Sequence, residues 1–243
     1  MTMKRFKIVI QALLIFLLVA FVVYRVAVSL KDNTVSELPV RGVDVSSYQG
    51  EIDWKAIEKE NISFAFIKAT EGSSYKDRFF EKNIKNIEKT DIVAGAYHFM
   101  SFESSGKSQA VNFIESVDKK KIALPPVIDV ELYGEYNVNP LKASEVRAIL
   151  DDMVAALYEE YGRYPIIYTT RRAYLLYISG EYKDCDIWIS DIVKKPALSD
   201  GRKWTFWQYS HTEKLPGYEG DEEYIDMNVF NGNRKEFEEY IRG

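Results

Sequence analysis

The sequence is poor in the residues that bind transition metals or crosslink chains. It contains one cysteine, Cys185, and two histidines, His98 and His211, among 243 residues. One cysteine cannot form an internal disulfide, and one cysteine with two histidines cannot complete a four-ligand zinc site. We therefore expect no internal disulfide, no metal site and no cofactor.

Glycine, proline and positive charge are also scarce. With 13 Gly and 7 Pro, the chain is neither collagen-like nor a low-complexity disordered segment, and 47% hydrophobic and 14% aromatic residues indicate a real core. Residues 1–37 hold five basic and two acidic residues, so they contribute +3 to the net charge of −5 and the remainder contributes −8. An acidic domain of this kind is unsuited to a phosphate backbone, and we expect no nucleic-acid partner.

The N-terminus carries a long hydrophobic run. Residues 8–24 are apolar except for Gln11, and Lys4, Arg5 and Lys7 precede them. A helix of this length spans about 25 to 30 Å, close to the hydrocarbon thickness of a bilayer. We expect a cytoplasmic stub at 1–7, a transmembrane anchor at 8–30, a polar tether at 31–39 and an exported domain at 40–243. The small residues at 27–29 leave a cleaved signal peptide open as the alternative.

Short β-rich runs alternate with helical patterns from residue 40 onward. The candidate strands are 40–45, 64–69, 93–99, 127–132, 166–170, 187–190, 205–209 and 225–230, and the candidate helices are 53–60, 78–88, 105–117, 141–161, 172–178 and 234–241. Strand then helix, repeated, implies parallel strands joined by crossover helices. We predict an irregular (β/α) TIM-like barrel with eight strands and fewer than eight helices, whose active site lies at the C-terminal ends of the strands.

Two carboxylates share one face of the strand at 127–132. Side chains alternate along a strand, so Asp129 and Glu131 point to one side and the apolar residues between them to the other. Burial and like charge both raise carboxyl pKa values, and a carboxyl that stays protonated near neutral pH is what a general acid requires. Asp44 and Asp226 lie in two further strands with apolar neighbours, which suggests one acidic cluster at the barrel mouth.

Aromatic and polar residues lie in the same candidate strands. Sugar rings pack on aromatic rings while their hydroxyls bond to polar side chains, so an acidic, aromatic groove suggests a glycan. Trp207, Tyr209 and Phe99 are further strand aromatics, whereas His98 is expected in the core. The candidate substrate-binding residues are Tyr97, Tyr168, Trp188, Lys68 and Gln208.

Six segments, in order along residues 40–243, resemble glycoside hydrolase family 25, the muramidase-type lysozymes. They are GVDVSSYQG at 42–50, IKATEG at 67–72, AYHF at 96–99, DVE at 129–131, WQY at 207–209 and DMNVFNG at 226–232. The resemblance implies cleavage of the β-1,4 bond between N-acetylmuramic acid and N-acetylglucosamine in peptidoglycan. It implies that Glu131 is the general acid, Asp129 its partner at the anomeric carbon, and Asp44 and Asp226 supporting acids.

Other functions remain open on the sequence alone. A catalytically silent peptidoglycan-binding module would keep the fold and the aromatic residues. A metal-dependent deacetylase or phosphodiesterase would use the carboxylates as ligands, and a scaffold would use the domain for protein contact. For the enzyme, we expect peptidoglycan strands as substrate and a single-pass location in the cell membrane, with the N-terminus inside and the catalytic domain outside.

Overall fold

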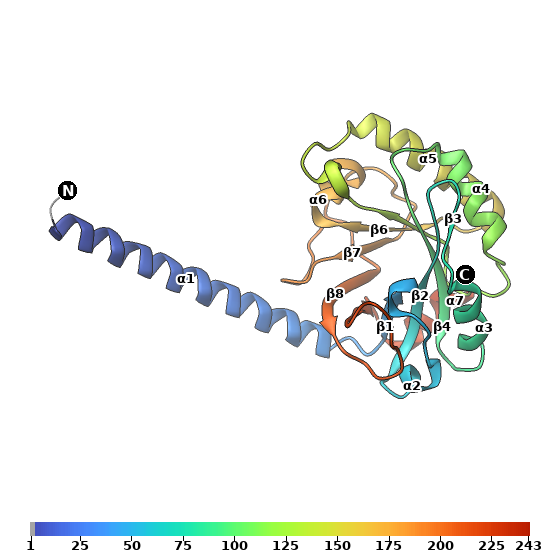
Figure 1. Ribbon diagram of the computed structural model, residues 1–243, viewed down its shortest axis with the longest axis horizontal. Helices are drawn as coiled ribbons and strands as arrows, with labels where there is room; N and C mark the ends of the chain where they lie inside the picture. Colours follow the sequence, from blue (N-terminus) through green and yellow to red (C-terminus); the bar gives the residue numbers. More distant parts are fainter. Residues whose placement is uncertain (1–2) are drawn as a thin grey trace.

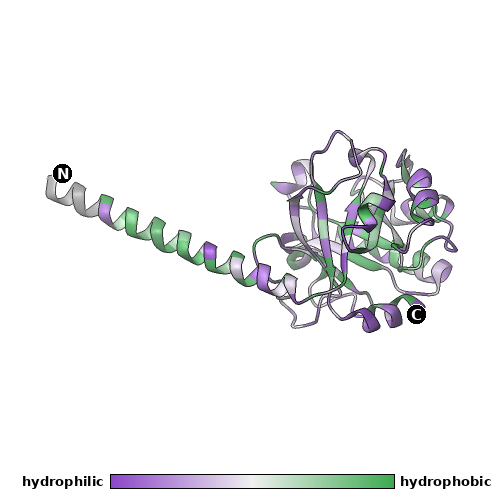
Figure 2. Ribbon diagram, turned by 90° about the horizontal axis from the view of Figure 1, so that it is seen from below, coloured by the Kyte–Doolittle hydropathy of each residue, from purple (hydrophilic) through white to green (hydrophobic). Residues whose placement is uncertain are grey.

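The computed structural model describes residues 3–243, and the side chains from Ile10 onward. Helix α1 (Met3–Ser36) projects from a folded domain that holds the rest of the chain (Figure 1). Its middle is apolar (Figure 2). The side chains from Ile10 to Val26 are exposed. By length and composition, residues Ile10–Ser36 are sufficient to cross a membrane. The helix includes residues 31–36, so most of the polar segment after the hydrophobic run is helical.

The domain alternates strands with helices for most of its length. The strands are β1 (Arg41–Val45), β2 (Ile62–Glu71), β3 (Tyr75–Lys76), β4 (Val93–Phe99), β5 (Val127–Val130), β6 (Ile166–Thr170), β7 (Ile187–Ser190), β8 (Phe206–Glu213) and β9 (Ile225–Phe230). The remaining helices are α2 (Trp54–Glu58), α3 (Phe80–Ile87), α4 (Gly106–Ser116), α5 (Ala143–Tyr161), α6 (Arg171–Ala173) and α7 (Arg234–Arg242). Short helical turns occur at η1 (Ser47–Gln49), η2 (Gly134–Asn137) and η3 (Tyr174–Ile178).

Eight strands close into a barrel, as the sequence predicts. Their order is β1-β9-β8-β7-β6-β5-β4-β2, and pairing of β1 with β2 completes the ring. The expectation of parallel strands is wrong for β9, which is antiparallel to both β1 and β8. The connection from β8 to β9 has no crossover helix, and a strand that returns directly pairs antiparallel. Strand β3 lies outside the barrel as a hairpin on β2.

Alternation along the strands gives the barrel two separate hydrophobic clusters. One fills the interior and includes Phe64, Phe66, Val127, Trp188 and Phe206. The other lies between the strands and the surrounding helices. Gly95 makes room for the interior cluster, because a Cβ at this position would lie 2.7 Å from the Phe66 ring. Large rings in a narrow barrel therefore depend on a small residue on the neighbouring strand.

Helix α7 covers the end of the barrel opposite the C-terminal ends of the parallel strands. The ring of Phe237 lies 5.6 Å from that of Phe64 and 5.3 Å from that of Phe230, and Tyr240 packs 5.7 Å from Phe206. Phe237 is 5% exposed and belongs to the interior cluster. We call this end of the barrel the lower end. Its interior layer is apolar, and polar residues occupy the upper layer, near the C-terminal ends of the parallel strands.

Candidate active site

A cavity of about 230 Å³ opens at the C-terminal ends of the barrel strands, where the fold predicts the active site. The structure brings all nine predicted site residues to its wall: Asp44, Lys68, Tyr97, Asp129, Glu131, Tyr168, Trp188, Gln208 and Asp226. A larger open cleft of about 800 Å³, lined by residues 50–53, Arg78 and residues 217–221, contains none of them.

The strand register sets the positions of two of the acids. Asp44 on β1 lies opposite Asp226 on β9, so two carboxylates far apart in the sequence are cross-strand neighbours. Asn228 Nδ2 donates to Asp44 Oδ2 over 2.7 Å. Gln208 Nε2 donates to both carboxylates, over 3.0 Å to Asp44 and 3.1 Å to Asp226. Donors held by the sheet therefore fix the orientation of both acids.

The amide of Gln208 is itself oriented by two hydroxyl groups. Tyr168 OH donates to Gln208 Oε1 over 3.0 Å, and Ser190 Oγ donates to the same atom over 2.8 Å. With its oxygen occupied in this way, the amide must present its nitrogen to Asp44 and Asp226. A chain of hydrogen bonds thus connects β6, β7 and β8 with the two acids on β1 and β9.

Asp129 and Glu131 enter the cavity from β5. Asp129 is 6% exposed and lies in register between Phe99 on β4 and Tyr168 on β6. Its Oδ1 is buried without a hydrogen-bond partner within the protein. The strand ends at Val130, two residues earlier than predicted, and Glu131 follows it at the cavity wall. A buried carboxylate oxygen without a partner is costly, and this is typical of an atom reserved for a ligand or a proton.

Burial raises the pKa values of all four acids. The pKa of Asp44 rises to about 6, that of Glu131 to about 7 and that of Asp226 to about 8, with desolvation as the main cause in each case. The pKa of Asp129 is raised well above its ordinary value by burial and by the neighbouring charge of Glu131. Like charges in one small cavity oppose each other's ionisation, so the cluster retains protons near neutral pH.

Lys68 on β2 supplies positive charge to this acidic cavity. Its Nζ lies 2.6 Å from Glu71 Oε2 and 5.0 Å from the centre of the Phe99 ring. The charge of Lys68 lowers the pKa of both Asp129 and Glu131, in opposition to the effect of burial. Lys68 therefore limits how strongly the pair on β5 holds its protons.

Aromatic side chains form the floor and walls of the cavity. Trp188 stacks on Phe66 with ring centres 4.3 Å apart, and its Nε1 donates to Asn228 Oδ1 over 2.7 Å. Trp207 and Tyr209 take no part, because they point outward from β8 into the outer hydrophobic cluster. His98 lies in the core as expected, with its ring nitrogens 2.7 Å from Thr70 Oγ1 and 3.0 Å from Gln109 Oε1.

Several lining residues were not among the candidates. Tyr48, Gln49 and Glu222 also line the cavity, and Glu71 contacts it through Lys68. Tyr48, Gln49 and Glu71 belong to two of the six segments that carry the family resemblance, and this membership could have identified them as candidates. Glu222 lies in an acidic loop between β8 and β9, and no periodic pattern places a loop residue at the mouth. Within residues 3–243, His, Cys, Asp and Glu side chains form no group of three or more that could hold a metal ion.

Comparison with known proteins identifies a family with this architecture. Residues 43–218 match the model of glycosyl hydrolases family 25. Lysozyme M1 of Streptomyces globisporus is 35% identical over 210 residues, covering 80% of this chain and 68% of the lysozyme. A family 25 glycosyl hydrolase structure from Bacillus anthracis is 54% identical, with a TM-score of 0.80 and coverage of 84% of this chain and 94% of that one. The bacterial lysozyme from Streptomyces coelicolor is 32% identical, with a TM-score of 0.73 over 83% of this chain and 96% of its own. The chain therefore belongs to glycosyl hydrolases family 25 and is a glycoside hydrolase.

Proposed function

We propose that the protein is an N-acetylmuramidase that cleaves the β-1,4 bond between N-acetylmuramic acid and N-acetylglucosamine in peptidoglycan. The observation that carries this proposal is the convergence of four carboxyl groups, one buried and three half-buried, at one end of a closed barrel. The names of its relatives, which include lysozymes and N,O-diacetylmuramidases, agree with this substrate. The cavity joins acid groups to aromatic surfaces, and a polar sugar with flat apolar faces needs both.

Glu131 acts as the general acid. With its pKa raised to about 7, it retains its proton over the pH range in which an ordinary glutamate has lost it. Cleavage of a glycosidic bond needs a proton on the departing oxygen, because an alkoxide is a poor leaving group. Glu131 lies at the cavity wall after the strand end, where a bridging sugar oxygen can approach it.

Asp129 acts at the anomeric carbon. Its partnerless Oδ1 lies in the same cavity and can face developing positive charge. The carboxylate either stabilises the oxocarbenium-like transition state directly or orients the N-acetyl group of the substrate as an internal nucleophile. Gln208 holds Asp44 and Asp226 in place, and the charge of Asp44 raises the pKa values of Asp129 and Glu131. Tyr97, Tyr168, Trp188 and Lys68 hold the sugar.

The N-terminal helix anchors the enzyme in the cell membrane, with the N-terminus inside and the catalytic domain outside. The cations before the apolar run favour this orientation. Because the domain begins within ten residues of the end of the predicted anchor at residue 30, it acts on peptidoglycan close to the membrane, in cell-wall remodelling or within an envelope assembly.

Replacement of Glu131 tests the assignment. Glu131→Gln keeps the shape but removes the transferable proton, and we expect hydrolysis of purified peptidoglycan to fall about 100- to 10,000-fold. Mass spectrometry of the fragments released by the unaltered enzyme should identify muramic acid at the new reducing ends. Glu115→Gln, an exposed position on α4, is the matched control and should be fully active.

Two results would contradict the proposal. Full hydrolysis by Glu131→Gln would remove Glu131 from its role as the acid. No hydrolysis by the unaltered enzyme, together with retained binding to peptidoglycan, would instead identify a catalytically silent binding module.

A further inference from the structure

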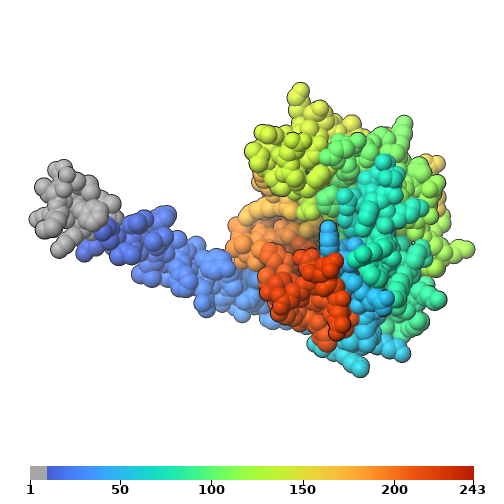
Figure 3. Space-filling view, in the orientation of Figure 1, coloured from blue at the N-terminus to red at the C-terminus, as the bar shows by residue number. Residues whose placement is uncertain are grey.

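One surface of the catalytic domain lies on the same side as α1 and is turned toward the apolar part of that helix. The segment between β7 and β8, together with α6 and η3, lies on the side of the barrel from which α1 projects (Figure 1). In the space-filling view, α1 leaves the domain beside the orange surface of this same region (Figure 3). We call this surface the α1-side face and define it by Arg171, Leu175, Ile192, Val193, Lys194 and Lys195.

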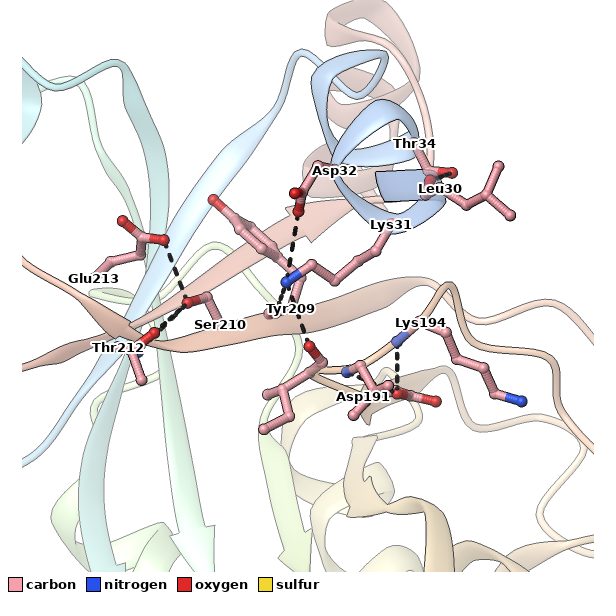
Figure 4. A network of polar contacts seen from close by, with 12 residues as sticks. Leu30, Lys31, Asp32, Thr34, Asp191, Lys194, Tyr209, Ser210, Thr212 and Glu213 are labelled. Atoms are coloured by element: carbon pink, nitrogen blue, oxygen red, sulfur yellow. Dashed lines mark hydrogen bonds and ion pairs between the residues drawn. The ribbon is translucent and has the colours of Figure 1, made fainter. Parts of the chain in front are cut away.

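The end of α1 is fixed against this face by direct contacts (Figure 4). Lys31 Nζ donates to the backbone carbonyls of Ile192, over 3.3 Å, and Tyr209, over 3.4 Å. Its side chain is only 14% exposed, and Val35 and Leu38 pack against the outer hydrophobic cluster. Helix and domain are therefore joined by packing as well as by the covalent chain.

This junction determines how far the face lies from a bilayer. The uninterrupted apolar run ends at Tyr24, and Lys31 follows seven residues later, which is about 10 Å along a helix. One headgroup layer is roughly 5 to 8 Å thick. If α1 spans the membrane, Ile192 lies at the outer edge of the lipid headgroups, because it contacts Lys31.

The α1-side face carries large apolar side chains that are partly exposed. Leu175, Ile192 and Val193 are 58%, 37% and 42% exposed. Leu175 and Asp191 line one pocket of about 180 Å³, so Leu175 and the 191–193 turn belong to one surface. Asp191 Oδ1 accepts from the backbone nitrogens of Val193 and Lys194, each over 3.1 Å, which holds this turn in shape.

Positive charge gathers on the same face although the domain as a whole is acidic. Lys194 and Lys195 are exposed, and neither forms an ion pair with the described residues. Arg171 forms an ion pair with Asp191, with Nη1 3.8 Å from Oδ2, so the two lysines supply the excess positive charge. Cations beside exposed apolar side chains are the composition of a surface that binds anionic lipid headgroups.

We infer that the α1-side face docks on the outer surface of an anionic phospholipid bilayer. This inference depends on the proposed role of α1 as a membrane anchor, and it adds a second contact between the domain and the bilayer. In it, Ile192, Val193 and Leu175 enter the interfacial layer, and Lys194 and Lys195 pair with lipid phosphates. The catalytic domain would then keep one orientation toward the membrane while it acts.

The test uses the full-length chain with a fluorescent label at Val193. Cys185 is buried, and burial raises its pKa to about 12, so a thiol reagent at neutral pH labels an introduced Val193→Cys selectively. The labelled protein is reconstituted in vesicles of phosphatidylglycerol and phosphatidylcholine that contain a headgroup-level quencher. We expect quenching several-fold stronger than for the matched control Val111→Cys, an exposed valine on α4 away from α1.

Charge reversal tests the lysines separately. Lys194→Glu with Lys195→Glu should reduce quenching at position 193 and leave hydrolysis of soluble glycan strands unchanged. Equal quenching at positions 193 and 111, in vesicles that float with the protein, would overturn docking while the anchor stands. Protein that fails to float with the vesicles would overturn both the docking and the membrane anchor. Absence of hydrolysis by the unaltered protein would instead contradict the proposed function.

Discussion

The lower and upper layers of the barrel interior differ sharply although the same strands build both. On β2, Phe66 lies in the lower layer and Lys68, two residues further on, in the upper one. On β8, Phe206 and Gln208 repeat the pattern. The lower layer is apolar and stabilises the fold, whereas the upper layer is polar and acidic and lines the cavity. On each of these strands, only two residues separate one layer from the other.

The two layers nevertheless depend on each other. The burial that lets the lower rings stabilise the fold also removes water from the carboxyl groups above them, and this desolvation is the main cause of their raised pKa values. Trp188 belongs to both layers, because it stacks on Phe66 and also lines the cavity. Substitutions in one layer should therefore affect the other in predictable directions.

The largest expected effect is on stability, from truncation of the lower layer. Phe66→Ala removes a fully buried ring under Trp188 and should lower the free energy of unfolding by about 3 to 5 kcal/mol. It should also lower hydrolysis at temperatures where the protein is folded, because Trp188 loses its support. Leu150→Ala, buried in the outer cluster, should cost about 2 to 5 kcal/mol without loss of activity in the folded state. Denaturant titration measures the loss of stability of each variant, and assays at denaturant concentrations below the unfolding transition measure the activity of its folded state. Equal activities of the two variants would show that the lower layer does not support the upper one.

A smaller and opposite effect on stability is expected in the upper layer. Asp226 has a pKa of about 8 in the folded protein, against 3.8 as its ordinary value, so the native state binds the proton more tightly than the unfolded chain does. The contribution of Asp226 to stability therefore falls as pH rises from about 4 to about 8. Asp226→Asn avoids this loss and should be about 1 to 3 kcal/mol more stable at pH 8, with a smaller gain at pH 5.

Unfolding measured at both pH values tests this sign. The control Asp221→Asn, whose side chain is 84% exposed, should show no such dependence on pH. A gain from Asp226→Asn that is the same at both pH values would mean that charge burial is not its cause.

The smallest effect concerns the pH profile. Hydrolysis should decline as pH rises through about 7, because Glu131 must be protonated. Lys68→Met removes a charge that lowers the pKa of Glu131, so the decline should move to higher pH by about one unit or less. The profile of kcat against pH measures this shift, and Lys107→Met, an exposed position on α4, should leave it in place. A shift to lower pH would contradict the electrostatic role of Lys68.

Much of the barrel could be predicted because its strands are short apolar runs separated by helical patterns. The direction of β9 could not be predicted from its own residues, because they are compatible with a parallel or an antiparallel strand. Only the absence of a crossover helix before β9 distinguishes the two directions. The end of β5 at Val130 was also missed, since Glu131 and Leu132 continue the alternation of the strand without pairing. Residues 31–36 are helical and Val35 packs against the domain, a contact that local composition does not reveal.

The site was predictable where alternation and family segments agreed. Asp129 and Glu131 share a face, and the structure places both at the cavity. The same rule applied to β8 would have separated Gln208, which points inward, from Trp207 and Tyr209, which point outward. The hydrogen bonds that join Tyr168, Ser190 and Gln208 to the acids depend on register across five strands, and a single sequence does not specify that register.

Closure of the lower end of the barrel by α7 determines how water reaches the acids. Phe237 and Tyr240 seal that end with rings that pack on Phe64, Phe230 and Phe206. The water that completes hydrolysis therefore has no route through the floor and must arrive through the same opening that admits the glycan. The glycan and the water therefore share one entrance to the four acids, and a glycan bound across that opening also limits the access of water.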